Sequence, residues 1–357
     1  MSTAPGPCHP AEPGPTPLQR VSGRDLPDFL AFIRRTDAAL PRPPVVVDLD
    51  DLRSGGASAV PLPTRHGVDP ILLGVSTAPV SADVASLSAS LTFTLAPGGV
   101  GRSWIDAPVA DTLEAVASTW GTAPVAASVL DRVLRATEHH SVPAALELES
   151  AAYSMLLASA EFAQWRSRVP RRGEVDDSPA VSVERRGSSL LVELDRPARR
   201  NAFNAAMRDQ LLEALAVAVA DDSITDIRLS GRGAAYCSGG DLDEFGTVDS
   251  PAAAHLVRLE QSAGHLVHVL RDRVVPSLHG ACIGAGIEIP SFASRVLASD
   301  GTWFQLPEVS MGLIPGAGGT VGIPRRIGRW RTAYLALTGQ RVGLDVALGW
   351  GLVDDRS

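Results

Sequence analysis

The sequence predicts an α/β protein. Three observations lead to this prediction: short apolar runs typical of strands, helical spacing of apolar side chains, and glycine-rich turns placed directly after strands. In the second half of the 357-residue chain these features recur in the order strand, glycine turn, helix. Such a succession favours an α/β architecture.

The composition excludes several classes of protein. A net charge of −8 gives no basic excess to neutralise nucleic-acid phosphates. Cys8, Cys237 and Cys282 form no CxxC pair, which indicates a reducing compartment without a disulfide framework. His139 and His140 lack metal-ligand spacing, so no metal site is expected. With neither a signal peptide nor a membrane-length apolar run, we expect a cytoplasmic protein that does not bind membranes.

Residues 1–19 are rich in Pro, Gly and small residues, and we expect a disordered tail. Residues 20–168 form a first body with two buried strands followed by helices. Its predicted elements are a helix at 26–40, strands within 44–52 and 70–77, and helices at 107–120, 124–137 and 143–168. In the last of these helices, Glu147 and Glu149 are expected to be solvated surface residues.

Residues 169–179 are charged, contain Pro and Gly, and predict a linker to a second body at 180–357. There the elements alternate, and Asn204 is the expected N-cap of the first helix. The predicted elements are a strand at 189–195, a helix at 201–222, a strand at 224–231, and a strand, glycine turn and helix at 274–288.

Two glycine turns, 231–245 and 279–288, each follow a strand. A turn that leads into a helix exposes unpaired N–H groups, and two such donors aimed at one point can hold an oxyanion. The alternative is that these glycines only permit tight turns.

Glu288 and Glu308 are the candidate acid–base groups. Both have apolar sequence neighbours, which tend to raise a carboxyl pKa, and a close pair can share a proton. For either one alone, a solvated helix residue or a buried structural ion pair is the more common outcome.

Residues 180–357 resemble the crotonase superfamily, the enoyl-CoA hydratase/isomerase family. Four motifs stand in the family's order: "RPARRNAFN" (196–204), "GRGAAYCSGGDLDEF" (231–245), "HGACIGAGIE" (279–288) and "FQLPEVSMGLIPGAGGT" (304–320). The resemblance implies a superhelix of repeated ββα units, a homo-oligomer (trimer or hexamer), and an acyl-CoA thioester as ligand. It implies no cofactor beyond the coenzyme A of the substrate itself.

The resemblance also implies roles for individual residues. The N–H groups of Gly240 and Ala285 would form the oxyanion hole, and Gly316 would turn its N–H toward the attacking water. Glu308 would supply the proton at Cα, and Glu288 would position the water as base. A shared or reversed assignment of the two glutamates stays open.

For binding, Arg199 and Arg200 are candidates to meet the phosphates of coenzyme A. Asp241 stands at the family's usual acidic position, where a binding role and a structural role in the turn are equally compatible. Cys237 is expected to be a small packed residue, since no basic partner is near in sequence.

Some positions depart from the family's pattern. His279 stands where Asn is common, Ser294 where Asp is common, and Gln305 where Gly is usual. Pro290 should shorten or kink the helix that contains Glu288. These changes concern the shape of the acyl pocket more than the acid–base pair.

The family normally continues for some tens of residues beyond "WGLVDD", with helices that cover the ligand site. Residues 128–168 resemble those closing helices, placed before the domain. We therefore interpret residues 20–168 as a degenerate crotonase-like unit whose helices cover the active half, in cis or from a neighbouring chain. The alternative is an independent helical accessory domain.

These features predict an enoyl-CoA hydratase, a hydro-lyase that adds water across the 2,3-double bond of a 2-enoyl-CoA. One alternative is an enoyl-CoA isomerase or another crotonase-type reaction of an acyl-CoA. The other is a non-catalytic acyl-CoA-binding subunit of a biosynthetic complex.

Overall fold

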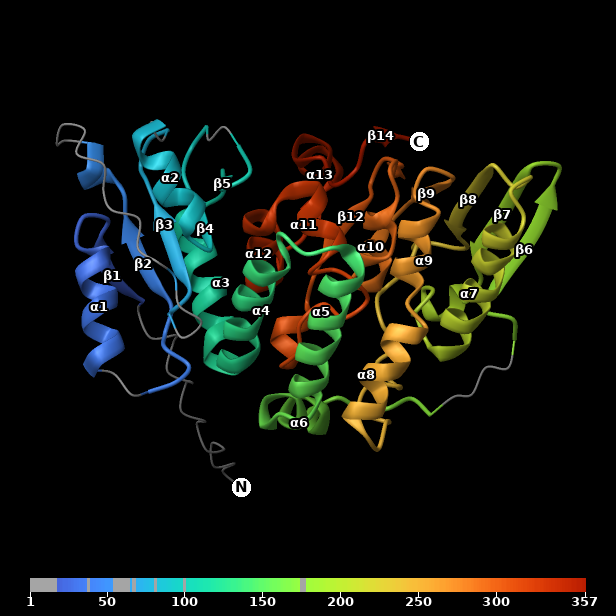
Figure 1. Cartoon of the computed structure of the whole chain (residues 1–357), viewed down its shortest axis with the longest axis horizontal. Helices are drawn as coiled ribbons and strands as arrows, with labels where there is room; N and C mark the ends of the chain where they lie inside the picture. The colour runs from blue at the N-terminus through green and yellow to red at the C-terminus, as the bar shows by residue number, and fades with distance from the viewer. Residues whose placement is uncertain are drawn as a thin grey trace, which may run out of the picture.

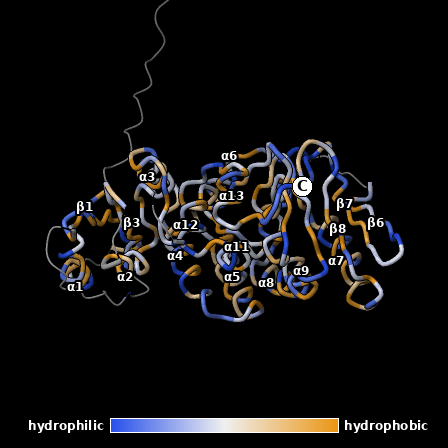
Figure 2. The backbone as a smooth tube through the Cα atoms, turned by 90° about the horizontal axis from the view of Figure 1, so that it is seen from above, coloured by the Kyte–Doolittle hydropathy of each residue, from blue (hydrophilic) through white to orange (hydrophobic). Residues whose placement is uncertain are grey.

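The chain folds into two α/β halves that lie side by side. A sheet of the N-terminal half lies at one end, the largest sheet of the C-terminal half lies at the other, and helices fill the middle (Figure 1). The view from above shows the same elongated arrangement, with β1 and β6 at opposite ends (Figure 2). The computed structural model describes residues 18–36, 39–53, 65, 69–79, 82–98, 101–173 and 178–357.

The N-terminal half contains a five-stranded sheet of order β1-β2-β3-β4-β5, in which all neighbours run parallel. Its strands are β1 (Gln19–Ser22), β2 (Val45–Asp48), β3 (Leu72–Val75), β4 (Phe93–Leu95) and β5 (Trp104–Ile105). The two predicted strands are β2 and β3. Residues 1–17 of the predicted disordered tail lie outside the described residues. Gln19, the predicted last residue of that tail, instead begins β1.

Helices account for most of the rest of this half. They are α1 (Leu26–Thr36), the short 3₁₀ helix η1 (Asp50–Arg53), α2 (Ala82–Ser90), α3 (Val109–Thr122), α4 (Pro124–Thr137), α5 (Val142–Leu157) and α6 (Ala160–Arg168). The prediction of one helix at 143–168 was wrong. The helix α5 ends at Leu157. Ser159 is the N-cap of α6, and its hydroxyl accepts a hydrogen bond from the Phe162 N–H.

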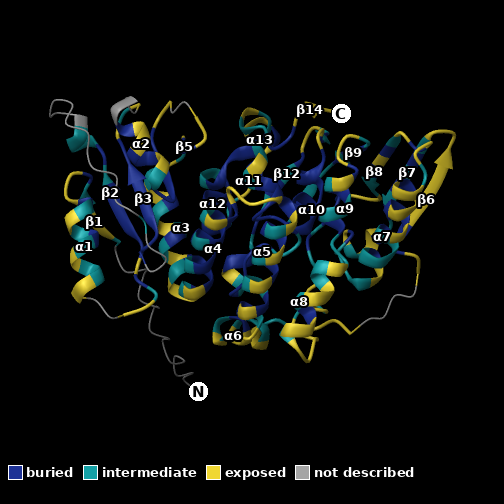
Figure 3. Ribbon diagram, in the orientation of Figure 1, coloured by how far each residue is buried: buried dark blue, intermediate teal, exposed yellow. Residues whose placement is uncertain are grey.

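The C-terminal half contains two sheets. One has six strands in the order β14-β11-β9-β8-β7-β6, and the other has three in the order β10-β12-β13. The strands are β6 (Val181–Arg186), β7 (Ser189–Leu194), β8 (Asp226–Gly231), β9 (Val274–Leu278), β10 (Ala281–Ile283), β11 (Leu297–Ala298), β12 (Trp303–Gln305), β13 (Val342–Gly343) and β14 (Asp355–Arg356). The edge strand β6 is mostly exposed (Figure 3).

The C-terminal half also contains α-helices and short 3₁₀ helices. They are η2 (Pro197–Arg199), α7 (Ala205–Ala220), α8 (Pro251–Glu260), α9 (Ala263–Val269), α10 (Ala285–Glu288), η3 (Pro290–Phe292), η4 (Glu308–Met311), α11 (Gly322–Ile327), α12 (Arg329–Thr338) and α13 (Leu344–Trp350). The series β6-β7-α7 and β9-β10-α10 each have the ββα order. This confirms the predicted α/β class with ββα units. Asn204 caps α7 as predicted, accepting from the Met207 N–H at 2.9 Å.

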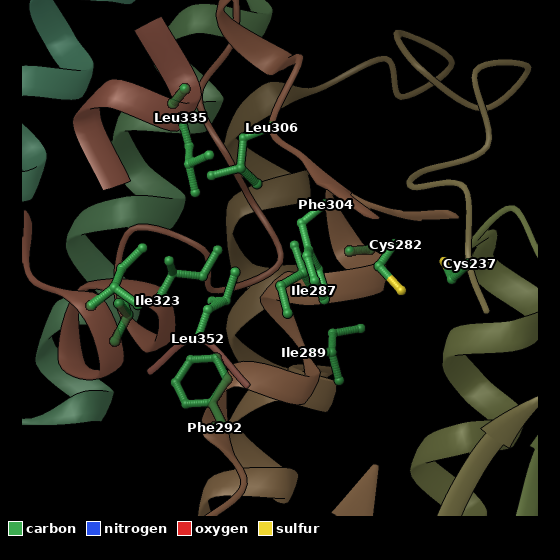
Figure 4. Packing of buried hydrophobic residues seen from close by; sticks show 14 of the residues in the cluster. Cys237, Cys282, Ile287, Ile289, Phe292, Phe304, Leu306, Ile323, Leu335 and Leu352 are labelled. Carbon is green, nitrogen blue, oxygen red and sulfur yellow. The ribbon is translucent and has the colours of Figure 1, made fainter. Parts of the chain in front are cut away.

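Pro290 shortens the helix of Glu288, as predicted. The α-helix α10 ends at Glu288, and Pro290 opens the 3₁₀ turn η3. The apolar side chains of this short segment, Ile287, Ile289 and Phe292, are buried, as is Phe304 of β12 (Figure 4).

The two halves share one hydrophobic core. Leu73 and Phe93 from the first sheet belong to the same buried cluster as Leu335 from α12. The rings of Phe93 and Tyr334 meet edge to face, with centroids 5.7 Å apart. Helices α4, α5 and α6 pack on elements of the C-terminal half within the same chain. The origin of the N-terminal half as a degenerate repeat, and the oligomeric state, stay predictions. Within the described residues, no helix has the length and apolar character needed to cross a membrane.

Candidate active site

The first glycine turn follows β8 and is held by a buried asparagine that the sequence reasoning missed. Asn201 lies in the left-handed region with φ 53°, a conformation that asparagine tolerates better than most residues. Its side-chain amide donates hydrogen bonds of 2.9, 3.0 and 3.1 Å to the carbonyl oxygens of Arg232, Ala235 and Tyr236. The shape of the turn therefore depends on this one side chain.

A β-bridge between Phe203 and Gly240 sets the direction of the Gly240 peptide. The Phe203 N–H donates to the Gly239 carbonyl at 2.8 Å, and the Asp241 N–H donates to the Phe203 carbonyl at 2.9 Å. In a parallel bridge, the N–H of the residue between those two partners points to the opposite side. The Gly240 N–H therefore faces away from Phe203.

The second glycine turn lies against the first. A Cβ added to Gly239 would lie 3.2 Å from the Ile283 carbonyl oxygen, and one added to Gly284 would lie 3.6 Å from the Gly239 Cα. Gly240 and Ala285 directly follow these touching glycines. Among the described residues, neither of their N–H groups donates a hydrogen bond to the protein. Two unused backbone donors thus lie in adjacent turns, as an oxyanion hole requires.

Glu288 and Glu308 are buried next to Gly284. Their exposed fractions are 2% and 8%. A Cβ added to Gly284 would lie 2.4 Å from Oε1 of Glu308 and 3.5 Å from Oε1 of Glu288. The structure thus brings together two carboxylates from separate motifs, and they share the glycine turn that contains one of the two unused N–H groups.

The two carboxylates differ in their partners. Oε2 of Glu288 accepts hydrogen bonds from the N–H groups of Ala317 and Gly319, at 2.8 and 2.9 Å. Oε2 of Glu308 is buried and has no hydrogen-bond partner in the described structure. An unpaired buried oxygen favours the protonated form of Glu308, whereas two N–H donors favour the ionised form of Glu288.

Burial raises the pKa of both groups. For Glu308, desolvation raises the pKa to about 8, and the nearby Glu149 contributes to the rise. For Glu288, desolvation and then the charges of Glu308 and Glu149 raise the pKa well above its usual range, against the opposing effect of its two N–H donors. For Glu308, such an environment suits a group that exchanges protons near neutral pH.

A third carboxylate, Glu149, enters the site from α5, and its predicted solvation was wrong. Its exposed fraction is 2%, and desolvation raises its pKa to about 7. It accepts hydrogen bonds from the N–H groups of Gly318 and Thr320, and from the Thr320 hydroxyl, at 2.7, 2.8 and 2.7 Å. A signal for this burial was present: Glu149 stands three residues after Leu146 and four before Tyr153, on the apolar face of α5.

Gly316 opens the segment that contacts these carboxylates. A Cβ added to it would lie 2.4 Å from the ring of Tyr153, another residue of α5 that the sequence reasoning did not place in the site. The guanidinium of Arg258, on α8, lies 4.7 Å from the centre of that ring. Gly316, Glu149 and Arg258 line one small cavity of 90 Å³. The predicted role of the Gly316 N–H toward water stays a prediction.

The candidate phosphate-binding residues have structural contacts. Asp241 is buried and pairs with Arg196 at 3.0 Å. The guanidinium of Arg199 lies 3.8 Å from Asp241 and also pairs with Asp243. Arg200 is exposed, and no ion pair joins it to another described residue. Contact of Arg199 or Arg200 with coenzyme A, and of Asp241 with ligand, stay predictions.

Positions that depart from the family's pattern make contacts within the protein. Nε2 of His279 lies 2.9 Å from the Gly233 carbonyl oxygen, and the Gln305 amide donates to Gly339 at 2.7 Å. Cys237 is buried, and desolvation raises the pKa of its thiol to about 12, in agreement with a packed residue. The described residues contain no group of three or more His, Cys, Asp or Glu side chains placed to hold a metal ion.

The fold and site define a class: an α/β protein of ββα units in which two glycine turns and buried carboxylates meet. This chain is similar in sequence to known proteins. The model of the family described as enoyl-CoA hydratase/isomerase matches residues 184–356. The 2,3-dehydroadipyl-CoA hydratase of Escherichia coli is 32% identical over 173 residues, which are 48% of this chain and 67% of that protein.

Two further similar proteins are named for different reactions. The trans-2-decenoyl-[acyl-carrier-protein] isomerase of Streptococcus mutans is 34% identical over 45% of this chain and 62% of its own length. The enoyl-CoA hydratase from Thermoplasma volcanium, known from a crystal structure, has 32% sequence identity to this chain and a TM-score of 0.47. The match covers 50% of this chain and 72% of that one. The chain thus spans about two thirds of the length of the two curated relatives. It belongs to the enoyl-CoA hydratase/isomerase family.

Proposed function

We propose that this protein hydrates the 2,3-double bond of a 2-enoyl-CoA thioester. The observation that carries the proposal is the pair of buried carboxylates at Gly284, one with two N–H donors and one with an unpaired oxygen. Hydration needs a base for water and an acid for Cα at the same time. A pair with unequal hydrogen bonding can provide both.

In the proposed mechanism, the thioester oxygen accepts hydrogen bonds from the N–H groups of Gly240 and Ala285. Charge drawn onto that oxygen makes Cβ of the enoyl group electrophilic. Glu288 takes a proton from the water molecule while the water oxygen forms a bond to Cβ. Protonated Glu308 donates its proton to Cα. Removing one oxyanion donor typically raises such a barrier by about 3 kcal/mol.

The test follows the loss of conjugated thioester absorbance with crotonyl-CoA and longer 2-enoyl-CoAs. Because each glutamate transfers a proton in the proposed mechanism, Glu288→Gln and Glu308→Gln should each lower kcat by roughly 10²–10⁴-fold. Glu213→Gln on α7 is a matched control, since Glu213 is exposed. Unchanged turnover in both site variants would refute the mechanism.

A second candidate is isomerisation of an enoyl thioester, favoured by the relative named as an isomerase. An isomerase moves a proton between two carbons and needs only one carboxylate. Incubation of 3-enoyl-CoA in deuterated water distinguishes the two reactions: a hydratase leaves it unchanged, whereas an isomerase forms the conjugated 2-enoyl product. Absence of turnover with both substrates would favour the non-catalytic acyl-CoA-binding subunit.

A further inference from the structure

The segment 317–320 is held by two carboxylates from opposite halves of the chain. Successive backbone N–H groups alternate between them: Ala317 and Gly319 donate to Glu288, and Gly318 and Thr320 donate to Glu149. Gly318 has φ +102°, a conformation that side chains rarely adopt. The four donors therefore form one cradle with a carboxylate on each side.

Glu149 lies far from this segment in the chain but close to it in space. It is separated from Gly318 by 169 positions, and it reaches the segment from α5, which packs on α8 of the C-terminal half. The Thr320 hydroxyl adds a third donor at 2.7 Å. Three donors on one fully buried carboxylate fix its position, and they fix the backbone that supplies two of them.

The charged and titratable groups around Glu149 come from several elements. On its own helix lies Tyr153, and on α8 lie Arg258 and His255, which contact Ser150. Across the cradle lie Glu288 and Glu308. The charge of Glu149 acts on both of these carboxyls and raises their pKa values.

We propose that Glu149 is a positioning residue for the acid–base pair, supplied by the N-terminal half to complete the active site within one chain. This proposal rests on the hydratase function proposed above. Glu149 holds the N–H groups of Gly318 and Thr320 on one side of the segment. The intervening N–H groups of Ala317 and Gly319 then face Glu288 and keep its carboxylate oriented toward the substrate.

The variant Glu149→Gln tests this role because the amide nitrogen of Gln is a donor and cannot accept from the cradle. We expect kcat to fall about 10–100-fold with KM changed less than about threefold, as for other positioning groups around a catalytic centre. Glu147→Gln is the matched control, since Glu147 is exposed on the same helix. Its kinetics should equal those of the unchanged protein.

The pH profile separates positioning from a general loss of structure. Without the charge that Glu149 carries above its pKa of about 7, the pKa values of Glu288 and Glu308 should fall, so the kcat profile should move to lower pH. Thr320→Val removes only the hydroxyl donor and keeps the charge. It should lower kcat less and leave the profile in place. An unshifted profile in Glu149→Gln would overturn the proposal.

Hydrogen exchange of the full-length, ligand-free protein gives a readout that does not depend on turnover. Peptides covering 317–320 should exchange faster in Glu149→Gln than in Glu147→Gln, while those of β7 and β8 exchange equally. Equal exchange at 317–320 would overturn the proposal. If the unchanged protein hydrates no 2-enoyl-CoA, the proposed function fails, and this comparison still decides whether Glu149 holds the cradle.

Discussion

At the scale of single residues, the candidate site contains two buried carboxylates that differ in their hydrogen-bond partners. Glu288 accepts hydrogen bonds from two backbone N–H groups, whereas Oε2 of Glu308 has no hydrogen-bond partner among the described residues. Buried ionised groups without partners are costly, and desolvation raises the pKa of Glu308 to about 8, which favours its protonated form at neutral pH. This difference supports the proposed acid role of Glu308 and the proposed base role of Glu288.

The same proton makes stability depend on pH. The pKa of Glu308 is about 8 in the folded protein and 4.5 as its ordinary value. Between these values the folded state binds more protons than the unfolded state, so the free energy of unfolding falls as pH rises. The slope from this group is at most about 1.4 kcal/mol per pH unit.

Urea denaturation between pH 5 and pH 8 measures this dependence. The unchanged protein should be most stable near pH 5, and Glu308→Gln should flatten the decline toward pH 8. Glu213→Gln, an exposed residue of α7, should leave the slope as it is. A free energy of unfolding that rises from pH 5 to pH 8 would contradict the inferred proton on Glu308.

At the scale of elements, α6 supports the first glycine turn. The rings of Phe162 and Trp165 stack with centroids 5.7 Å apart, and Trp165 lies 6.2 Å from Phe245. Phe245 in turn covers Gly240, where an added Cβ would lie 2.5 Å from its ring. A helix from the N-terminal half therefore packs, through aromatic contacts, on the turn with the candidate oxyanion donor.

Phe162→Ala should destabilise the protein by about 3–5 kcal/mol, because Phe162 is 4% exposed and its loss leaves a cavity. It should also lower kcat, since Phe245 and the turn at Gly240 lose support. Urea denaturation and the hydration assay measure the two effects. Phe32→Ala on α1 is the control: Phe32 is 58% exposed, and a change below about 0.5 kcal/mol is expected. Equal stability of the two variants would show that α6 does not support the turn.

At the scale of the whole molecule, the two halves are not independent. One buried cluster runs from the N-terminal sheet through α4 and α5 into the C-terminal half. The site itself also crosses the boundary, because Glu149 and Tyr153 come from α5. The N-terminal half is therefore part of the core and of the candidate site.

A fragment of residues 180–357 should be insoluble or inactive when expressed alone. It would expose the apolar surface of α12 that packs on Phe93, and it would lack Glu149. Solubility and crotonyl-CoA hydration, measured beside the full chain, test this. Full activity from the fragment would show that the N-terminal half has no role in the site.

The sequence by itself determined the local structure and the main motifs. Helix spacing placed α3 and α4, Asn204 was found as a cap, and the two glycine turns and both glutamates were identified from short stretches. Such features depend on residues close together in the chain, where propensity and spacing decide the backbone. The break between α5 and α6 was missed because apolar spacing continues across Ser159.

Only the tertiary structure decided the environment of Glu149. Its spacing on α5 indicated the apolar face, but no local pattern tells which surface that face will meet. Contacts across 169 positions form when the whole core packs, and the N–H groups of Gly318 and Thr320 acquire an acceptor only then. Glu149, which was expected at the surface, is therefore a buried third carboxylate of the candidate site because it accepts hydrogen bonds from these N–H groups.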